Sequence, residues 1–214
     1  MEPDYPIDAS LNFVGDQLLF KWRRLDGTEC GKFIAPSAAR AAFSHVPIDT
    51  GWIKPGVTRW GMNHNGEWTV IFIPPSVHKL ILNPKAKRPI SAPLPGLVFL
   101  HQEHNSHVWA ISEPEFSPEA IVHYAPLPNV GSDGRICFGS NSISGLNTMA
   151  TWTLFIGSPF NNHSANGKSK LEPTDVRNLL KQLSGKKEYP VNDLVLPARY
   201  DQKTVDRAIR DLVK

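Results

Sequence analysis

Hydrophobic positions in the first two thirds of the chain fall in short runs that are typical of strands. Residues 68–73 are rich in β-branched and aromatic side chains and end at a double proline, so they predict a buried strand. Residues 97–100 and 108–111 flank a polar tip and predict a hairpin. Residues 120–124 add one more apolar run. Together these runs predict an antiparallel β-meander.

The last quarter of the chain changes to helical spacing. Residues 176–183 carry valine and leucine on one face, with Thr174 as the predicted N-cap and Gly185 as the stop signal. Residues 205–212 have an apolar stripe opposite charged positions, which predicts a second helix. Residues 152–156 fit either a strand or a buried helical turn, and a helix is favoured.

The N-terminal part has its own pattern. Residues 11–22 read as two short strands around a Gly-Asp turn, and Ser37 is the predicted N-cap of a helix over residues 38–43. Strands early and helices late predict an α+β fold. We expect residues 1–66 to form an N-terminal extension with a β-hairpin and a short helix, and residues 67–214 to form the core with its C-terminal helices.

Composition narrows the functional classes. The 41% hydrophobic and 20% charged residues are near globular averages, and the net charge of +3 comes from scattered lysines and arginines, so neither nucleic acid nor a membrane is an expected partner. The acidic N-terminus is unlike a secretory signal, which favours the cytoplasm. The two cysteines, Cys30 and Cys137, lie in different surroundings, and we expect reduced thiols.

A long polar, glycine-rich segment follows the predicted meander, over residues 125–147. Long irregular segments in compact domains are often functional. This one contains Asn129 and, eight positions later, Cys137 after Gly134 and Ile136. A cysteine on such a loop is suited to act as a nucleophile, provided that it is accessible to its partners. Residues 138–146 should then be exposed.

The segment resembles the active site of ubiquitin-conjugating enzymes, in which a His-Pro-Asn tripeptide precedes a turn and the nucleophilic cysteine, with eight positions from Asn to Cys. The matching residues are Pro128, Asn129, Val130, Gly134, Ile136, Cys137 and Phe138. Leu127 replaces the family histidine. Trp152 and residues 158–163 further resemble the bacterial branch that includes PRTRC system protein B, found in operons with a ubiquitin-like protein and a ThiF-like activating enzyme.

The resemblance implies a ubiquitin-conjugating-enzyme-like fold and a transferase without a cofactor of its own. Cys137 would accept a ubiquitin-like protein as a thioester from the ThiF-like activating enzyme, and pass it to an acceptor protein or a small nucleophile. Asn129 would donate its side-chain amide to the thioester oxygen. Pro128, Leu127 and Gly134 would shape the loop, because the family histidine is credited with shaping and not with proton transfer.

Alternatives stay open for the same residues. Cys137 is also compatible with a small buried residue, and Asn129 with an Asx-turn that only holds the loop. An inactive module that binds or assembles ubiquitin-like proteins is the second functional reading, with Leu127 as its hint. A cysteine hydrolase that uses His123 or His163 as the base is the third.

Three histidines near the predicted hairpin tip, His101, His104 and His107, have the spacing of a candidate metal cluster. A hairpin alternates its faces, and no cysteine is near enough to complete a familiar zinc set. A solvated hairpin tip is therefore the favoured interpretation, and no metal is expected. Cys30, in a short polar turn, is interpreted as structural or incidental.

Overall fold

The computed structural model describes residues 9–43, 56–63, 65–85, 88–145, 147–197 and 203–213. The chain forms two compact units, Met1–Ile53 and Lys54–Lys214. The sequence pattern places residues 57–63 in the N-terminal part. In the structure they form a strand of the second unit, because they pair with the strand that follows them.

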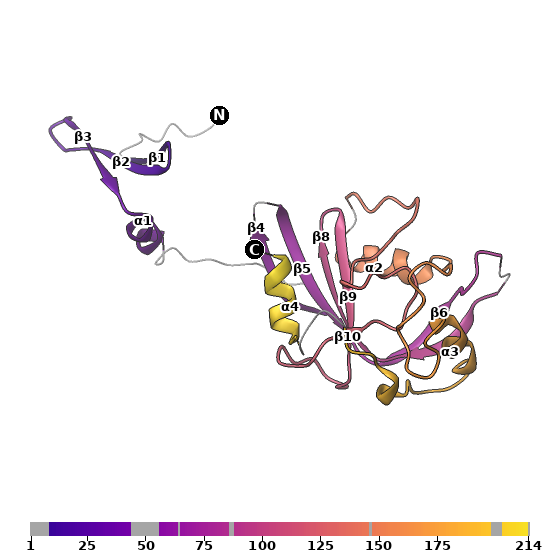
Figure 1. Ribbon diagram of the computed structural model, residues 1–214. Coiled ribbons are helices and arrows are strands. Elements are labelled where there is room, and N and C mark those ends of the chain that lie inside the picture. Colours follow the sequence, from indigo (N-terminus) through magenta and orange to yellow (C-terminus); the bar gives the residue numbers. More distant parts are fainter. Residues whose placement is uncertain are drawn as a thin grey trace. The chain divides into compact units, whose positions relative to one another are not determined.

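The first unit is a small antiparallel sheet with one helix (Figure 1). Its elements are β1 (Ala9–Val14), β2 (Gln17–Arg23), β3 (Glu29–Ile34) and α1 (Pro36–Phe43). The hairpin predicted over residues 11–22 is confirmed as β1 and β2, whereas β3 was not predicted. The helix begins at Pro36, one position before the predicted N-cap Ser37, and proline is favoured in a first helical turn.

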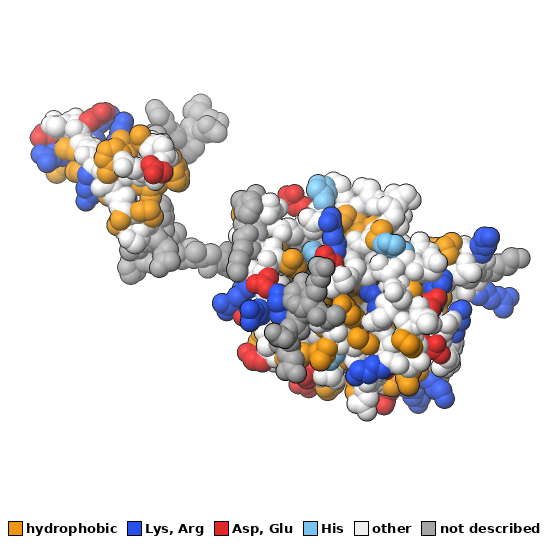
Figure 2. Space-filling model, viewed as in Figure 1, with side chains coloured by type: hydrophobic (Ala, Val, Ile, Leu, Met, Phe, Trp, Pro, Cys, Tyr) orange, Lys and Arg blue, Asp and Glu red, His pale blue; other side chains and the backbone are white. Residues whose placement is uncertain are grey.

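Hydrophobic side chains are visible on the surface of this small unit (Figure 2). Phe13 is 83% exposed and Phe33 is 59% exposed. Ala39 alone is buried among the side chains that the structure describes in β1–β3 and the start of α1. A sheet of this size buries little apolar surface, so packing inside the unit contributes little to its stability.

A five-stranded antiparallel sheet forms the centre of the second unit, in the order β10-β9-β8-β5-β4. Its strands are β4 (Val57–Asn63), β5 (Gly66–Ile73), β8 (Gly96–Gln102), β9 (Asn105–Ile111) and β10 (His123–Tyr124). The predicted strand over residues 68–73 and the hairpin of residues 97–100 and 108–111 are confirmed. The predicted strand over residues 120–124 is reduced to its last two residues, and Ile121, which precedes them, makes an isolated bridge to Thr204.

Both faces of this sheet are covered, which explains the uninterrupted apolar runs (Figure 1). In β8, Leu97 and Phe99 point to one core and Val98 and Leu100 to the other. Helix α2 (Thr148–Gly157) packs on the first face, and α4 (Val205–Leu212) packs on the second. Helix α3 (Val176–Gln182) adds Leu179 and Leu180 to the first core. Every residue of β8 is buried as a result.

Four features of the second unit differ from the sequence pattern or go beyond it. Residues 76–94, between β5 and β8, contain a two-stranded ribbon of β6 (Ser76–Leu80) and β7 (Ile90–Leu94), which was not predicted. Asp175 and not Thr174 caps α3, because its side chain accepts the N–H of Arg177. The ambiguous segment over residues 152–156 is helical, within α2. A 3-10 turn, η1 (Val191–Asp193), lies between α3 and α4.

The architecture is α+β with antiparallel sheets, as the sequence predicts. Among the described residues, no helix has the length and apolar character needed to cross a membrane.

Candidate functional site

Residues 129–137 form a tight hairpin inside the long irregular segment that follows β10. The backbone N–H of Cys137 donates to the carbonyl of Asn129 at 2.8 Å. One step further in, Val130 lies opposite Ile136 in an isolated antiparallel bridge. Residue 129 is therefore held opposite residue 137, and this register gives the eight-position spacing a structural reason.

The turn of this hairpin is closed by backbone bonds and one carboxylate. The Gly131 N–H donates to the Arg135 carbonyl at 2.7 Å, and the Gly134 N–H donates to the Gly131 carbonyl at 3.1 Å. The Asp133 carboxylate accepts the Arg135 N–H at 3.0 Å. Gly134 has φ +86°, a conformation that glycine adopts without strain.

The second arm of the hairpin is fastened to the start of β9. The Ile136 N–H donates to the Ser106 carbonyl at 2.9 Å, and the Val108 N–H donates to the Gly134 carbonyl at 2.8 Å. A Cβ at Gly134 would lie 2.6 Å from Trp109 Nε1, so only glycine lets the hairpin approach the sheet this closely. Sequence reasoning did not find Ser106 or Trp109, because their role depends on backbone bonds and on a contact across the fold.

Asn129 occupies a strained position at the open end of the hairpin. Its φ is 60°, in the left-handed region that asparagine tolerates better than most residues. Its N–H donates to the carbonyl of His163 at 2.8 Å, which joins the loop after α2 to the hairpin. Its side-chain oxygen Oδ1 is buried and has no hydrogen-bond partner among the described residues, so Oδ1 does not close an Asx-turn.

Cys137 is a free thiol and is exposed. The residue that follows it, Phe138, is half-buried and packs edge-on against Phe155 of α2, with ring centroids 6.0 Å apart. The Phe138 carbonyl also accepts the N–H of Asn141 at 3.1 Å. The backbone is therefore fixed on both sides of Cys137 while the thiol itself stays accessible to a partner.

The segment after the cysteine is exposed for most of its described length, as predicted. The exposed residues are Gly139, Ser140, Asn141, Ser142, Ser144 and Gly145. Two positions differ, because Phe138 is half-buried and Ile143 is 7% exposed. Leu146 lies outside the described residues. The exposed part borders Cys137 and gives a partner access to it.

Leu127 and Pro128, the residues that replace or match the family's first two motif positions, are both buried. Leu127 is fully buried in the larger apolar core, next to residues of the sheet and of α2. Its N–H donates to the Ala125 carbonyl at 2.7 Å. A leucine here anchors the base of the hairpin by packing.

The prediction of a solvated histidine tip is wrong for two of the three residues. His101 is 7% exposed and its Nδ1 lies 2.9 Å from Ser106 Oγ, while His107 is 8% exposed and stacks on Trp109. Burial lowers the pKa of His107 to about 4. His104 is exposed. Strands β8 and β9 extend almost to the turn, which buries both outer histidines. No group of candidate metal ligands occurs among the described residues.

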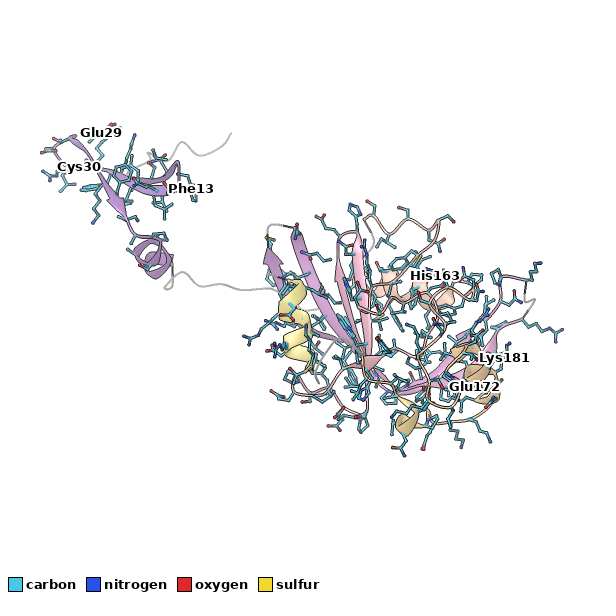
Figure 3. All side chains as sticks on the ribbon, viewed as in Figure 1. Phe13, Glu29, Cys30, His163, Glu172 and Lys181 are labelled. Carbon is cyan, nitrogen blue, oxygen red and sulfur yellow. The ribbon has the colours of Figure 1, made fainter. Side chains whose placement is uncertain are left out.

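The structure does not show His123 or His163 acting as a base on Cys137, and Cys30 lies in the first unit. His123 is in β10, where its Nδ1 lies 3.1 Å from the Ile121 carbonyl. His163 meets the site through its backbone carbonyl, and its side chain is exposed (Figure 3). Cys30 is half-buried in β3 of the first unit. Within the described part of the chain, no hydrogen bond joins a histidine ring to the Cys137 thiol.

The antiparallel sheet with flanking helices and the Asn-to-Cys hairpin define the class, an E2-like protein of the ubiquitin-conjugation type. Residues 32–196 match the model of prokaryotic E2 family D, and the chain belongs to this family. The family implies a role in the conjugation of a ubiquitin-like protein, with that protein and an activating enzyme as partners. The match begins within β3, so β1 and β2 lie outside it.

No curated protein and no solved structure matches the chain.

Proposed function

We propose that the protein is a conjugating enzyme that carries a ubiquitin-like protein as a thioester on Cys137. The observation that supports this most is the pairing of an exposed Cys137 with Asn129 across a fixed hairpin, in a chain of an E2 family. The expected donor is a ThiF-like activating enzyme.

In the first step the Cys137 thiolate attacks the C-terminal carbonyl of the ubiquitin-like protein, which is held as a thioester on the activating enzyme. The new Cys137 thioester forms and the activating enzyme's thiolate leaves. The donor is already activated, so this exchange needs no base beside Cys137. An exposed thiol on a fixed backbone suits such a transfer between proteins.

In the second step an amine of an acceptor attacks the thioester carbonyl. Negative charge develops on the carbonyl oxygen, the Cys137 thiolate leaves, and the amine releases a proton to solvent. An amide donor from Asn129, aimed at this oxygen, would lower the barrier by about 3 kcal/mol. The Asn129 Oδ1 is the buried end of this side-chain amide, and its NH₂ group is the other end. This arrangement is compatible with donation from the NH₂ group to the thioester oxygen.

The test is a charging assay with a ubiquitin-like protein and its ThiF-like activating enzyme, with ATP and magnesium. We expect an adduct that reductant removes, that Cys137→Ser converts to a reductant-resistant ester, and that Cys30→Ser leaves unchanged. Cys30 is the matched control because it is also a free thiol and lies in the other unit.

If the activating enzyme becomes charged but no adduct forms on this protein, the transferase proposal is wrong and a binding or assembly role takes its place. A hydrolase would instead cleave a preformed conjugate, and would need a base near Cys137. The position of His123 gives that reading no support.

A further inference from the structure

Lys168 is a buried lysine to which the proposed reaction assigns no role. Lys168 is only 4% exposed, and its Nζ donates a hydrogen bond to the Val130 carbonyl at 2.6 Å. The ring of Tyr124 lies 5.8 Å from the same atom. Burial lowers the pKa of Lys168 to about 8, against the opposing effect of Asp133. A charged group is thus kept out of water directly beneath the candidate site.

The backbone that carries Lys168 is fixed by a buried carboxylate. Asp193 is 2% exposed, and its Oδ1 accepts hydrogen bonds from the Ser169 hydroxyl and the Leu171 N–H, both at 2.8 Å. Its Oδ2 accepts from the Tyr189 hydroxyl at 2.6 Å. These bonds hold the residues directly after Lys168, so the ammonium is presented from a rigid base.

The Val130 carbonyl is a specific acceptor for this ammonium. The hydrogen bonds beside the Val130–Ile136 bridge are made by the flanking residues, from Cys137 to Asn129 and from Gly131 to Arg135. In such an antiparallel pair the central residues do not bond to each other. The Val130 carbonyl therefore points out of the hairpin, where Lys168 binds it.

We propose that Lys168 is a positioning residue: by holding the Val130 carbonyl, it fixes the hairpin that carries Asn129 and Cys137. This proposal rests on the proposed function of the protein. Stability alone is a poor explanation for a buried ammonium, because an apolar residue of similar length avoids the cost of desolvating the charge. Lys168 lies below the hairpin and touches its backbone, so it acts through Asn129 and Cys137 and not on the substrate.

Amide hydrogen exchange on the full chain tests the positioning role without any partner protein. In Lys168→Met we expect the amides of Asn129 and Cys137 to exchange at least ten-fold faster, and those of β8 and β9 to stay unchanged. The matched control is Lys170→Met, since the exposed Lys170 also donates to a backbone carbonyl, that of Asn192 at 3.0 Å. The control should leave the hairpin amides unchanged.

A kinetic measurement separates positioning from a purely structural role. In Lys168→Met we expect charging of Cys137 to stay within two-fold, and discharge of the thioester to free amine to fall at least ten-fold. Lys168→Gln keeps an N–H donor without the charge, and should recover part of the discharge rate. If Lys168→Met does not fold, Lys168→Gln is compared with wild type instead, and we expect its hairpin amides to exchange faster and its discharge rate to fall, each by less than ten-fold.

The proposal is overturned if hairpin exchange is unchanged, or if exchange rises equally in β8 and β9. Discharge at the wild-type rate with a loosened hairpin also overturns it. If the wild-type protein forms no thioester at all, the proposed function fails, while the exchange experiment still decides whether Lys168 fixes the hairpin.

Discussion

The backbone N–H of Cys137 donates to the backbone carbonyl of Asn129 across 2.8 Å. This bond makes the two residues opposite partners in one hairpin, so the distance along the sequence between them is set by the register of the turn. Adding or removing one residue between them would move one of the two out of register. The eight-position spacing in this chain is thus a property of the hairpin backbone.

Gly134 should tolerate alanine poorly. Gly134→Ala places a side chain at φ +86° and 2.6 Å from Trp109 Nε1, and we expect a loss of about 3 kcal/mol in the free energy of unfolding. Gly139→Ala is the matched control, since it has φ +62° and nothing within 4 Å, and should cost about 1 kcal/mol. Urea denaturation measures both. Equal losses would mean that the contact with Trp109 does not constrain the hairpin.

Asn129 combines a left-handed backbone with a candidate oxyanion donor, and two substitutions separate these properties. Asn129→Gly suits the backbone and removes the amide, so stability and charging should be kept while discharge falls about 100-fold. Asn129→Ala should show the same discharge defect and an added stability loss of about 1 kcal/mol. Single-turnover discharge and urea denaturation give the two values. If Asn129→Gly discharges at the wild-type rate, the Asn129 side chain is not the oxyanion donor and only its backbone conformation matters.

Restoring the family histidine should not improve the protein. Leu127 is fully buried among apolar residues, so Leu127→His buries a polar ring there and should cost about 3 kcal/mol in unfolding free energy. Leu127→Met keeps the apolar character and should cost less than about 1.5 kcal/mol. Wild-type stability in Leu127→His would reveal a polar partner for the ring at this position.

Stability should fall in mild acid through His107. Burial lowers the pKa of His107 from 6.5 to about 4. Above pH 6.5 the ring is therefore neutral in both the folded and unfolded states, and its protonation does not change the free energy of unfolding. As the pH falls from 6.5 to 4 the unfolded state binds a proton that the folded state does not. We expect about 3 kcal/mol of stability to be lost over this window.

The measurement for His107 is a pH series of urea denaturation on wild type and His107→Gln. Burial also lowers the pKa of His78 and of His123, so wild type loses stability through those residues as well. The difference between the two proteins isolates His107. A difference that is constant from pH 4 to pH 7 would contradict the buried neutral ring.

Elements with a strong local pattern were predictable from the sequence. The β8–β9 hairpin, β5, α3 and α4 each follow from apolar spacing with turn or cap residues. The Asn129-to-Cys137 spacing marked the candidate site, but the segment was expected to be irregular and its hairpin was not predicted. The edge strand β4 and the β6–β7 ribbon were missed. The described side chains of β4 and β6 are mostly exposed or half-buried, and the buried stretch of β7 is short and contains Pro93, so no apolar run marks these strands. Backbone pairing defines them.

The amino-acid sequence by itself determined the α+β class, the E2-like motif and the identity of the candidate nucleophile, because these depend on residue types at short separations. Only the tertiary structure decided what surrounds that motif. Ser106, Trp109, His163 and Lys168 meet the hairpin through carbonyl oxygens, a ring face and a buried ammonium, at separations in the chain that carry no periodic signal. Contacts of this kind form only when the sheet folds. Every residue has a backbone carbonyl, so the residue types do not show which carbonyls will accept a hydrogen bond.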